Sequence, residues 1–99
     1  MREKKLAPIT PGEILSEEFL KPLGLAPHRL ALDLRVPANR IAAIIDGKRA
    51  ISVDTAMRLG RYFGTSAEFW INLQTQFDLR KAKEESGDRI AREVAPRAA

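Results

Sequence analysis

The chain has no cysteine, which excludes disulfide bonds and metal sites built from thiolates. It has no apolar run that approaches the ~20 residues of a membrane-spanning helix. Residues 1–5 are mostly charged, and no apolar signal segment follows them, so we do not expect a secreted protein. These absences lead us to expect a cytoplasmic protein that does not bind membranes.

Residues that build active sites are also scarce. His28 is the single histidine, and one histidine without cysteines or a carboxylate cluster does not make a metal site. The glycines form no phosphate-binding loop, and the serines lack a nearby base in any recognisable motif. A chain of 99 residues suggests one small domain without a large cleft. We therefore expect no enzymatic activity, no cofactor and no small-molecule substrate.

Positive charge is abundant, and it is concentrated in one segment. The formal net charge is +4 at pH 7. Residues 35–64 hold six cations and two acids, while the rest of the chain is balanced. Small basic proteins are common, but a localised excess of this kind favours a polyanionic partner such as nucleic acid.

Two short helices are predicted where the basic segment begins. Apolar residues recur at helical spacing on both sides of Val36-Pro37, and the proline breaks the pattern between them. The residues of the two stripes are Leu30, Ala31 and Leu34, then Ile41, Ile44 and Ile45. The small side chain at position 31 lets two helices cross closely, which predicts a helix-turn-helix. Its second helix would present residues 37–40 and Ala43 to the major groove of DNA.

A strong start signal predicts a helix near the N-terminus. Thr10 and Glu13 form a T-x-x-E capping box, and Pro11 occupies the first helical position. We expect this helix to end near Lys21, because Pro22 disfavours a helical conformation in the residue before it.

Capping residues predict two more helices after the helix-turn-helix. Ser52 is expected to cap a helix that stops at Gly64. Thr65 and Glu68 form a second T-x-x-E box, which predicts a fifth helix that reaches about Lys83.

These elements predict an all-α chain of five helices, without repeats or strand-like alternation. The helices are expected over residues 11–21, 27–34, 37–46, 53–63 and 66–83. We divide the chain into a flexible N-terminal arm (1–9), a helix-turn-helix domain with a dimerising fifth helix (10–83) and a polar C-terminal tail (84–99). Residues 88–94 could add one or two helical turns within that tail.

Several motifs, in order, resemble a known family. Residues 30–63 resemble the Xre/Cro-type (lambda-repressor-like) helix-turn-helix family, and the flanking motifs narrow the resemblance to HigA/VapI-type antitoxins. Those motifs are TPGEILSEEFLKPLG (10–24), Arg40-Ile41, DGKRAI (46–51), DTAMRL (54–59) and FGTSAEFWINLQ (63–74). The resemblance covers about residues 8–79, which is most of the chain.

The resemblance implies a dimeric antitoxin that binds DNA. Such a protein neutralises a RelE-like (HigB-like) ribonuclease toxin that cleaves mRNA on the ribosome, and it represses its own toxin–antitoxin operon. By elimination, the candidates for the toxin-binding surface are the first helix, the N-terminal arm and the C-terminal tail, and we rank the N-terminal segment with the first helix first. Two alternatives stay open: an orphan Xre-type repressor without a toxin, and a protein-interaction module whose helix-turn-helix is vestigial.

Two positions depart from the family pattern. The family usually has Ser or Thr followed by Gln at the start of the second helix, where the Gln contacts the DNA backbone. Here Ala26-Pro27 removes the cap and the Gln, and His28 and Arg29 are candidates to replace its contact. Arg35 stands where the family usually has Gly in the turn, so a positive φ there would strain the backbone; otherwise the turn differs in conformation.

The predicted DNA contacts centre on the second helix of the motif. Arg40 is the main candidate to bond the O6 and N7 atoms of a guanine, unless it forms an ion pair with Asp33 or Asp46. Asn39 can read an adenine or touch a phosphate, or it can simply cap the helix. The complete set of candidate DNA-binding residues is Ala38, Asn39, Arg40, Ala43, Lys48, Arg49, His28 and Arg29.

The flanking candidates have plainer alternatives. Lys48 and Arg49 suit phosphate contacts, which position a protein without reading sequence, or they are solvated surface charges. His28 is a phosphate contact or an ordinary exposed side chain. For Arg58 we favour a structural salt bridge over a contact with DNA.

Aromatic and apolar residues in the fifth helix predict a dimer interface. Trp70, Leu73 and Phe77 fall at i, i+3 and i+7, with Phe69 beside them. They could complete the core of one chain, but the first four helices already make a compact domain. We therefore interpret them as a symmetric homodimer seam, with Trp70 nearer the core and Phe77 nearer the interface.

Overall fold

Helices account for the regular structure of the computed structural model, which describes residues 8–98. The elements are α1 (Pro11–Ile14), the π-helix η1 (Leu15–Leu20), α2 (Lys21–Leu23), α3 (Pro27–Leu34), α4 (Ala38–Ile45), α5 (Val53–Phe63) and α6 (Ala67–Glu93). Because α1, η1 and α2 run on without a break, these residues form five helical rods and no strand. The prediction of an all-α, five-helix chain is confirmed. Most of the expected N-terminal arm (1–9), and Ala99 of the tail, lie outside the described residues.

The first rod begins as the capping box predicts. Thr10 Oγ1 accepts the backbone N–H of Glu13 over 3.1 Å, and Glu13 Oε1 accepts the N–H of Thr10 over 2.9 Å. Pro11 follows as the first helical residue. This reciprocal pair satisfies two of the N–H groups that a helix start otherwise leaves without partners.

The end of the first rod differs from the prediction. The helical conformation does not stop at Lys21 but continues through Pro22 to Leu23. The turns before the proline are widened into η1, and the Lys21 N–H bonds to the carbonyl of Ser16. A proline has no N–H to donate, and its ring crowds the carbonyl one turn earlier. We attribute the wider π turns to this crowding, since they relieve it without breaking the rod.

Serine side chains cap the N-termini of α5 and α6. Ser52 Oγ accepts the N–H of Thr55 over 3.2 Å, as predicted. The predicted box at Thr65 is wrong, because Ser66 caps α6 through the N–H of Phe69 over 3.1 Å. Thr65 instead accepts the indole N–H of Trp70 over 2.9 Å.

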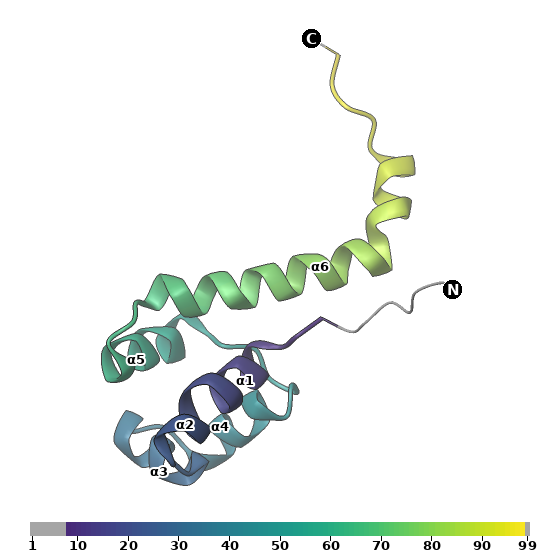
Figure 1. Ribbon diagram of the computed structural model, residues 1–99. Coiled ribbons are helices and arrows are strands. Elements are labelled where there is room, and N and C mark those ends of the chain that lie inside the picture. The colour runs from purple at the N-terminus through teal and green to yellow at the C-terminus, as the bar shows by residue number, and fades with distance from the viewer. Residues whose placement is uncertain (1–7, 99) are drawn as a thin grey trace.

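Helix α6 is longer than predicted. It passes Lys83 and ends at Glu93, so residues 84–93 of the expected polar tail are helical. The polarity of this stretch suits an exposed helix, and a pair such as Arg89 and Glu93, 3.4 Å apart, lies at the favourable i, i+4 spacing. Figure 1 shows that the C-terminal part of α6 turns and stands clear of the other helices.

The core lies where all five rods meet. Its fully or nearly fully buried residues are Leu15, Leu20, Leu30, Ala31, Leu34, Ile41, Ile44, Ile51, Ala56, Leu59 and Trp70. Helix α6 packs mainly on α5, while α1 packs on both α4 and α6. None of the described helices is apolar enough over a sufficient length to cross a membrane.

Candidate nucleic-acid interface

The turn between α3 and α4 has the geometry of a Schellman motif. The Arg35 N–H bonds to the carbonyl of Leu32 over 3.1 Å, and the Val36 N–H bonds to that of Ala31 over 3.0 Å. Arg35 adopts φ 62° and is the one non-glycine residue with positive φ among those described. The turn keeps the left-handed conformation that glycine usually supplies, with an arginine in its place.

Helices α1 and α4 approach too closely for a side chain at Gly12. A Cβ atom there would lie 1.9 Å from the carbonyl oxygen of Ile44. The start of α1 therefore packs against the C-terminal end of α4. This contact holds the second helix of the motif at the end farther from the turn. The sequence interpretation missed this role, although a glycine inside a predicted helix signals a packing constraint.

One face of α4 is buried, and the opposite face is open. Ile41 and Ile44 are at most 1% exposed, whereas the exposed residues of α4 are Ala38, Asn39 and Ala42. Ala43 is half-buried at the edge of this face. Apart from Asn39 the face carries only methyl side chains, so the backbone of α4 can come close to a partner. Ala42 was not among the candidates, although the i, i+4 spacing from Ala38 points to it.

Arg40 turns partly inward instead of facing outward with Asn39. Its side chain is 25% exposed, and its Nη1 lies 3.3 Å from Oδ2 of Asp54 in α5. An ion pair is therefore present, but its partner is neither Asp33 nor Asp46. The Arg40 Nε atom is buried and has no hydrogen-bond partner in the described structure.

Helix α6 anchors the basic loop that follows α4. Lys48 and Arg49 are exposed. Gln74, which is 8% exposed, accepts the backbone N–H of Ile51 at Oε1 over 2.8 Å. Its Nε2 donates to Asp78 over 2.9 Å. Gln74 thereby anchors the loop, a role that the sequence interpretation missed because nothing local links residues that are so far apart in the chain.

The first turn of α3 carries two more candidates. His28 and Arg29 are exposed. Arg29 Nε lies 3.3 Å from Asp33 Oδ1, one turn along the same helix. Ala26 occupies the cap position, and no side chain accepts a hydrogen bond there, as the departure from the family pattern predicts.

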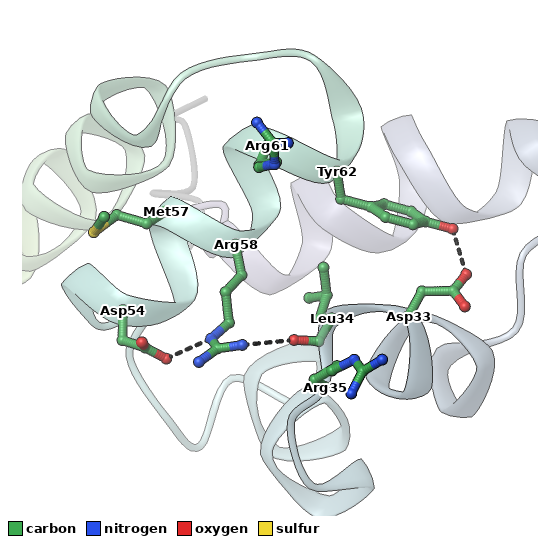
Figure 2. A pocket seen from close by; sticks show the side chains of 8 residues that line it. All are labelled: Asp33, Leu34, Arg35, Asp54, Met57, Arg58, Arg61 and Tyr62. Carbon is green, nitrogen blue, oxygen red and sulfur yellow. Dashed lines mark hydrogen bonds and ion pairs between the residues drawn. The ribbon is translucent and has the colours of Figure 1, made fainter.

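A groove of about 480 Å³ lies between α3 and α5, beside the turn, and Figure 2 shows the side chains that line it. Within it Arg58 of α5 makes two hydrogen bonds. Its Nε donates to Asp54 of the same helix over 2.9 Å, and its Nη1 donates to the Leu34 carbonyl over 2.9 Å, which links α5 to α3. The structural role predicted for Arg58 agrees with these contacts. The Arg58 hydrogen bond, with a smaller effect from Arg40, holds the pKa of Asp54 below its ordinary value of 3.8.

A second polar pair closes the other end of the groove. Tyr62 donates its hydroxyl to Asp33 over 2.6 Å. This hydrogen bond raises the pKa of Tyr62 above its ordinary value of 10.0. Asp33 thus links α3 to α5 while it also faces Arg29.

The predicted dimer residues separate into two groups. Trp70 is 0% exposed and packs with Phe69 at a ring-centroid distance of 5.0 Å, so its placement in a dimer seam is corrected: it belongs to the core of one chain. Phe69 is 37% exposed. Leu73 and Phe77 are half-buried and line a shallow cavity of about 190 Å³.

No group of three or more His, Asp or Glu side chains in residues 8–98 could hold a metal ion. The described structure has a short exposed helix face on α4, an exposed basic loop that follows it in the chain, and exposed basic residues at the start of α3. An arrangement of this kind can dock a helix in a DNA groove and bond the adjacent phosphates.

Comparisons with known proteins give close relatives. No protein-family model matches the chain. It is 48% identical over 83 residues to virulence-associated protein I of Dichelobacter nodosus, covering 84% of this chain and 77% of that protein.

Two solved structures resemble the whole fold. The structure of Pseudomonas aeruginosa antitoxin HigA with the higBA promoter gives a TM-score of 0.89 at 46% identity, and the match covers 92% of this chain and 99% of that chain. Antitoxin GraA in complex with its operator gives a TM-score of 0.89 at 40% identity over 100% of both chains. Identities this high over nearly complete chains show relationship as well as a shared fold.

Proposed function

Since the chain belongs to the HigA-type antitoxins of the Xre-like helix-turn-helix family, we propose that it binds the operator of its own operon as a homodimer and neutralises a RelE-like ribonuclease toxin. Members of this family are regulators and not enzymes. The proposal has three parts, namely operator binding, dimerisation and toxin binding, and each is supported by a different surface.

The exposed face of α4 carries the proposal of operator binding. Asn39 has the donor and acceptor geometry that pairs with an adenine edge, and the methyl groups of Ala38 and Ala42 suit contact with thymine methyls. Lys48 and Arg49 are exposed in the loop that follows, where they would bond phosphates. Sequence reading and positioning would then come from adjacent parts of one surface.

Dimerisation is proposed through α6. A palindromic operator requires two recognition helices about 34 Å apart, which a symmetric dimer supplies. Leu73 and Phe77 share their shallow cavity with Ile9 and Ile14, and Ile9 is 66% exposed. Burial of this apolar surface in a partner chain would favour association, and Phe69 is a candidate for the rim.

Toxin binding is proposed for the outer face of the first rod. Glu13, Glu17 and Glu18 are exposed there, and this acidic face complements a small basic toxin. Glu17 Oε2 lies 2.6 Å from Lys21 Nζ, so Glu18 is the residue to reverse. Glu18→Lys should weaken co-purification with the product of an adjacent toxin gene, while Glu85→Lys on α6 should not. If no toxin gene lies next to the gene of this chain and no toxin co-purifies with the folded protein, the chain is instead an orphan repressor.

The proposed DNA contacts are tested by alanine variants on operator and random DNA across a salt series. Lys48→Ala should weaken binding to both DNAs and lower the salt slope by about one unit, whereas Lys81→Ala on α6 should change neither. Arg40→Ala should cost about 1–3 kcal/mol on the operator and less on random DNA. Equal losses on the two DNAs would remove Arg40 from sequence reading.

A further inference from the structure

Asp54, at the start of α5, is shared by two arginines. Its Oδ2 atom accepts from Arg58 Nε over 2.9 Å and lies 3.3 Å from Arg40 Nη1. Arg58 belongs to the same helix, while Arg40 lies in α4. One carboxylate therefore connects the candidate base reader to the helix behind the motif.

The two contacts of Asp54 are unequal. Arg58 makes the shorter bond and is also fixed by its 2.9 Å bond to the Leu34 carbonyl, so it remains in place whatever Arg40 does. Arg40 makes the longer contact, and its buried Nε has no hydrogen-bond partner in the described structure. A buried N–H without a partner is unfavourable. Arg40 is thus incompletely satisfied where it lies.

Departure of Arg40 would leave no unpaired charge behind it. Asp54 would keep Arg58 and is itself well exposed, with 57% of its side chain open to solvent. An ion pair whose carboxylate is exposed to this extent is weak. The guanidinium can therefore exchange its partner at small cost.

We propose that Arg40 alternates between Asp54 in the free protein and an acceptor atom of DNA in the complex, so that Asp54 competes with DNA for this side chain. This inference rests on the proposed DNA-binding function. The acceptor is a guanine edge or a phosphate oxygen, both of which bond a guanidinium through the same N–H groups. Asp54 then lowers affinity for DNA on which Arg40 leaves it for an acceptor, and it does not change affinity for DNA that offers Arg40 no acceptor.

The test compares Asp54→Asn with Asp46→Asn in the wild-type and Arg40→Met backgrounds. Asparagine at position 54 retains an oxygen that can accept from Arg58. The control, Asp46→Asn, removes the same charge at the C-terminal end of α4, away from Arg40. Arg40→Met keeps an apolar stem of similar length. Dissociation constants are measured on operator and random DNA at one salt concentration, and the thermal unfolding of each variant confirms that it is folded.

We expect Asp54→Asn to tighten operator binding about two- to fivefold more than Asp46→Asn does, and we expect this excess to vanish in the Arg40→Met background. An excess on the operator alone identifies a guanine edge, and an equal excess on both DNAs identifies a phosphate. No excess, or one that persists without Arg40, would overturn the inference while operator binding by the wild type stands. Failure of the wild type to prefer its operator would overturn the proposed function and this inference with it.

Discussion

The side chain of Gln74 in α6 accepts the backbone N–H of Ile51 over 2.8 Å, and this single bond ties the proposed dimerisation helix to the loop that carries Lys48 and Arg49. Both partners are buried, Ile51 to 3% and Gln74 to 8% exposure. The surface proposed for phosphate contacts is therefore supported by a helix from the far side of the domain.

Replacing Gln74 by leucine should destabilise the fold by about 1–3 kcal/mol, because the Ile51 N–H would stay buried without an acceptor. Binding to all DNA sequences should weaken as well, since the basic loop loses its anchor. Urea unfolding and DNA titration measure the two effects. Asn72→Leu, at an exposed neighbouring position on α6, is the control, and equal losses in the two variants would contradict the anchoring role.

Gly12→Ala and Gly87→Ala should have opposite effects on stability. At Gly12 a Cβ atom would lie 1.9 Å from the Ile44 carbonyl oxygen, so α1 and α4 must separate, at a cost of about 1–3 kcal/mol or more. At Gly87 the nearest atom, Lys83 Cβ, is 4.0 Å away, so alanine should stabilise the helix by about 0.5–1 kcal/mol. Thermal unfolding of both variants compares them directly, and a neutral Gly12→Ala would refute the close approach.

Arg35→Gly should stabilise the isolated domain. The left-handed conformation costs a non-glycine residue about 1–2 kcal/mol, and glycine removes this cost. Glycine also gives the unfolded chain more freedom, which cancels about 0.4–1 kcal/mol of the gain in stability. A net gain of about 0.5–1 kcal/mol is expected. Arg35→Ala keeps a non-glycine residue at the φ of 62°, so it should gain no stability, and thermal unfolding of the two variants compares them.

The contribution of Asp54 to stability should depend on acid pH. Its folded-state pKa is lowered, chiefly by the Arg58 hydrogen bond, from an ordinary value of 3.8. A lowered carboxyl pKa stabilises the fold fully above the unfolded value, and the stabilisation is lost as pH falls through the folded value. The difference in unfolding free energy between wild type and Asp54→Asn should be constant near neutral pH and shrink below pH 3.8.

Two controls identify the source of that pH dependence. The acid-dependent part should diminish in an Arg58→Met background, which removes the main cause of the shift. It should also diminish at high salt, since Asp54 is exposed and its charge interactions are screened. A difference that grows as the pH is lowered would have the wrong sign and would contradict the role of Asp54.

Phe77→Glu should give a folded monomer if the cavity shared by Leu73 and Phe77 is the dimer seam. A carboxylate there would be buried against apolar side chains of the partner, which is unfavourable. Sedimentation equilibrium measures the mass, and Thr75→Glu on the exposed face of α6 should leave the dimer intact. A Phe77→Glu protein that is still dimeric would place the seam elsewhere.

Local patterns were enough to predict most of the fold. Capping by Thr10 and Ser52, and apolar spacing around Ile41 and Ile44, depend on neighbours a few residues apart, and the structure confirms them. Errors arose where two local signals compete. Thr65 and Ser66 both suit a cap, and only the packing of Trp70, which takes the Thr65 hydroxyl, decides between them.

The parts of the site that escaped prediction depend on contacts distant in sequence. Arg40 could be placed on α4, but its partner Asp54 lies in another helix, and no local pattern links the two. The same holds for Gln74 and the Ile51 backbone, and for Gly12 against Ile44. The sequence was enough to predict which helix is exposed, but not the contacts that position it.

The most direct test of the account is the affinity of the wild-type chain for the DNA upstream of its own gene and for random DNA of equal length, measured across a salt series. We predict tight, selective binding to the upstream DNA, with an affinity that falls steeply as salt rises because Lys and Arg contacts displace counterions. Weak binding of equal strength to both DNAs would contradict the account, and it would show that the helix-turn-helix of this chain no longer reads sequence.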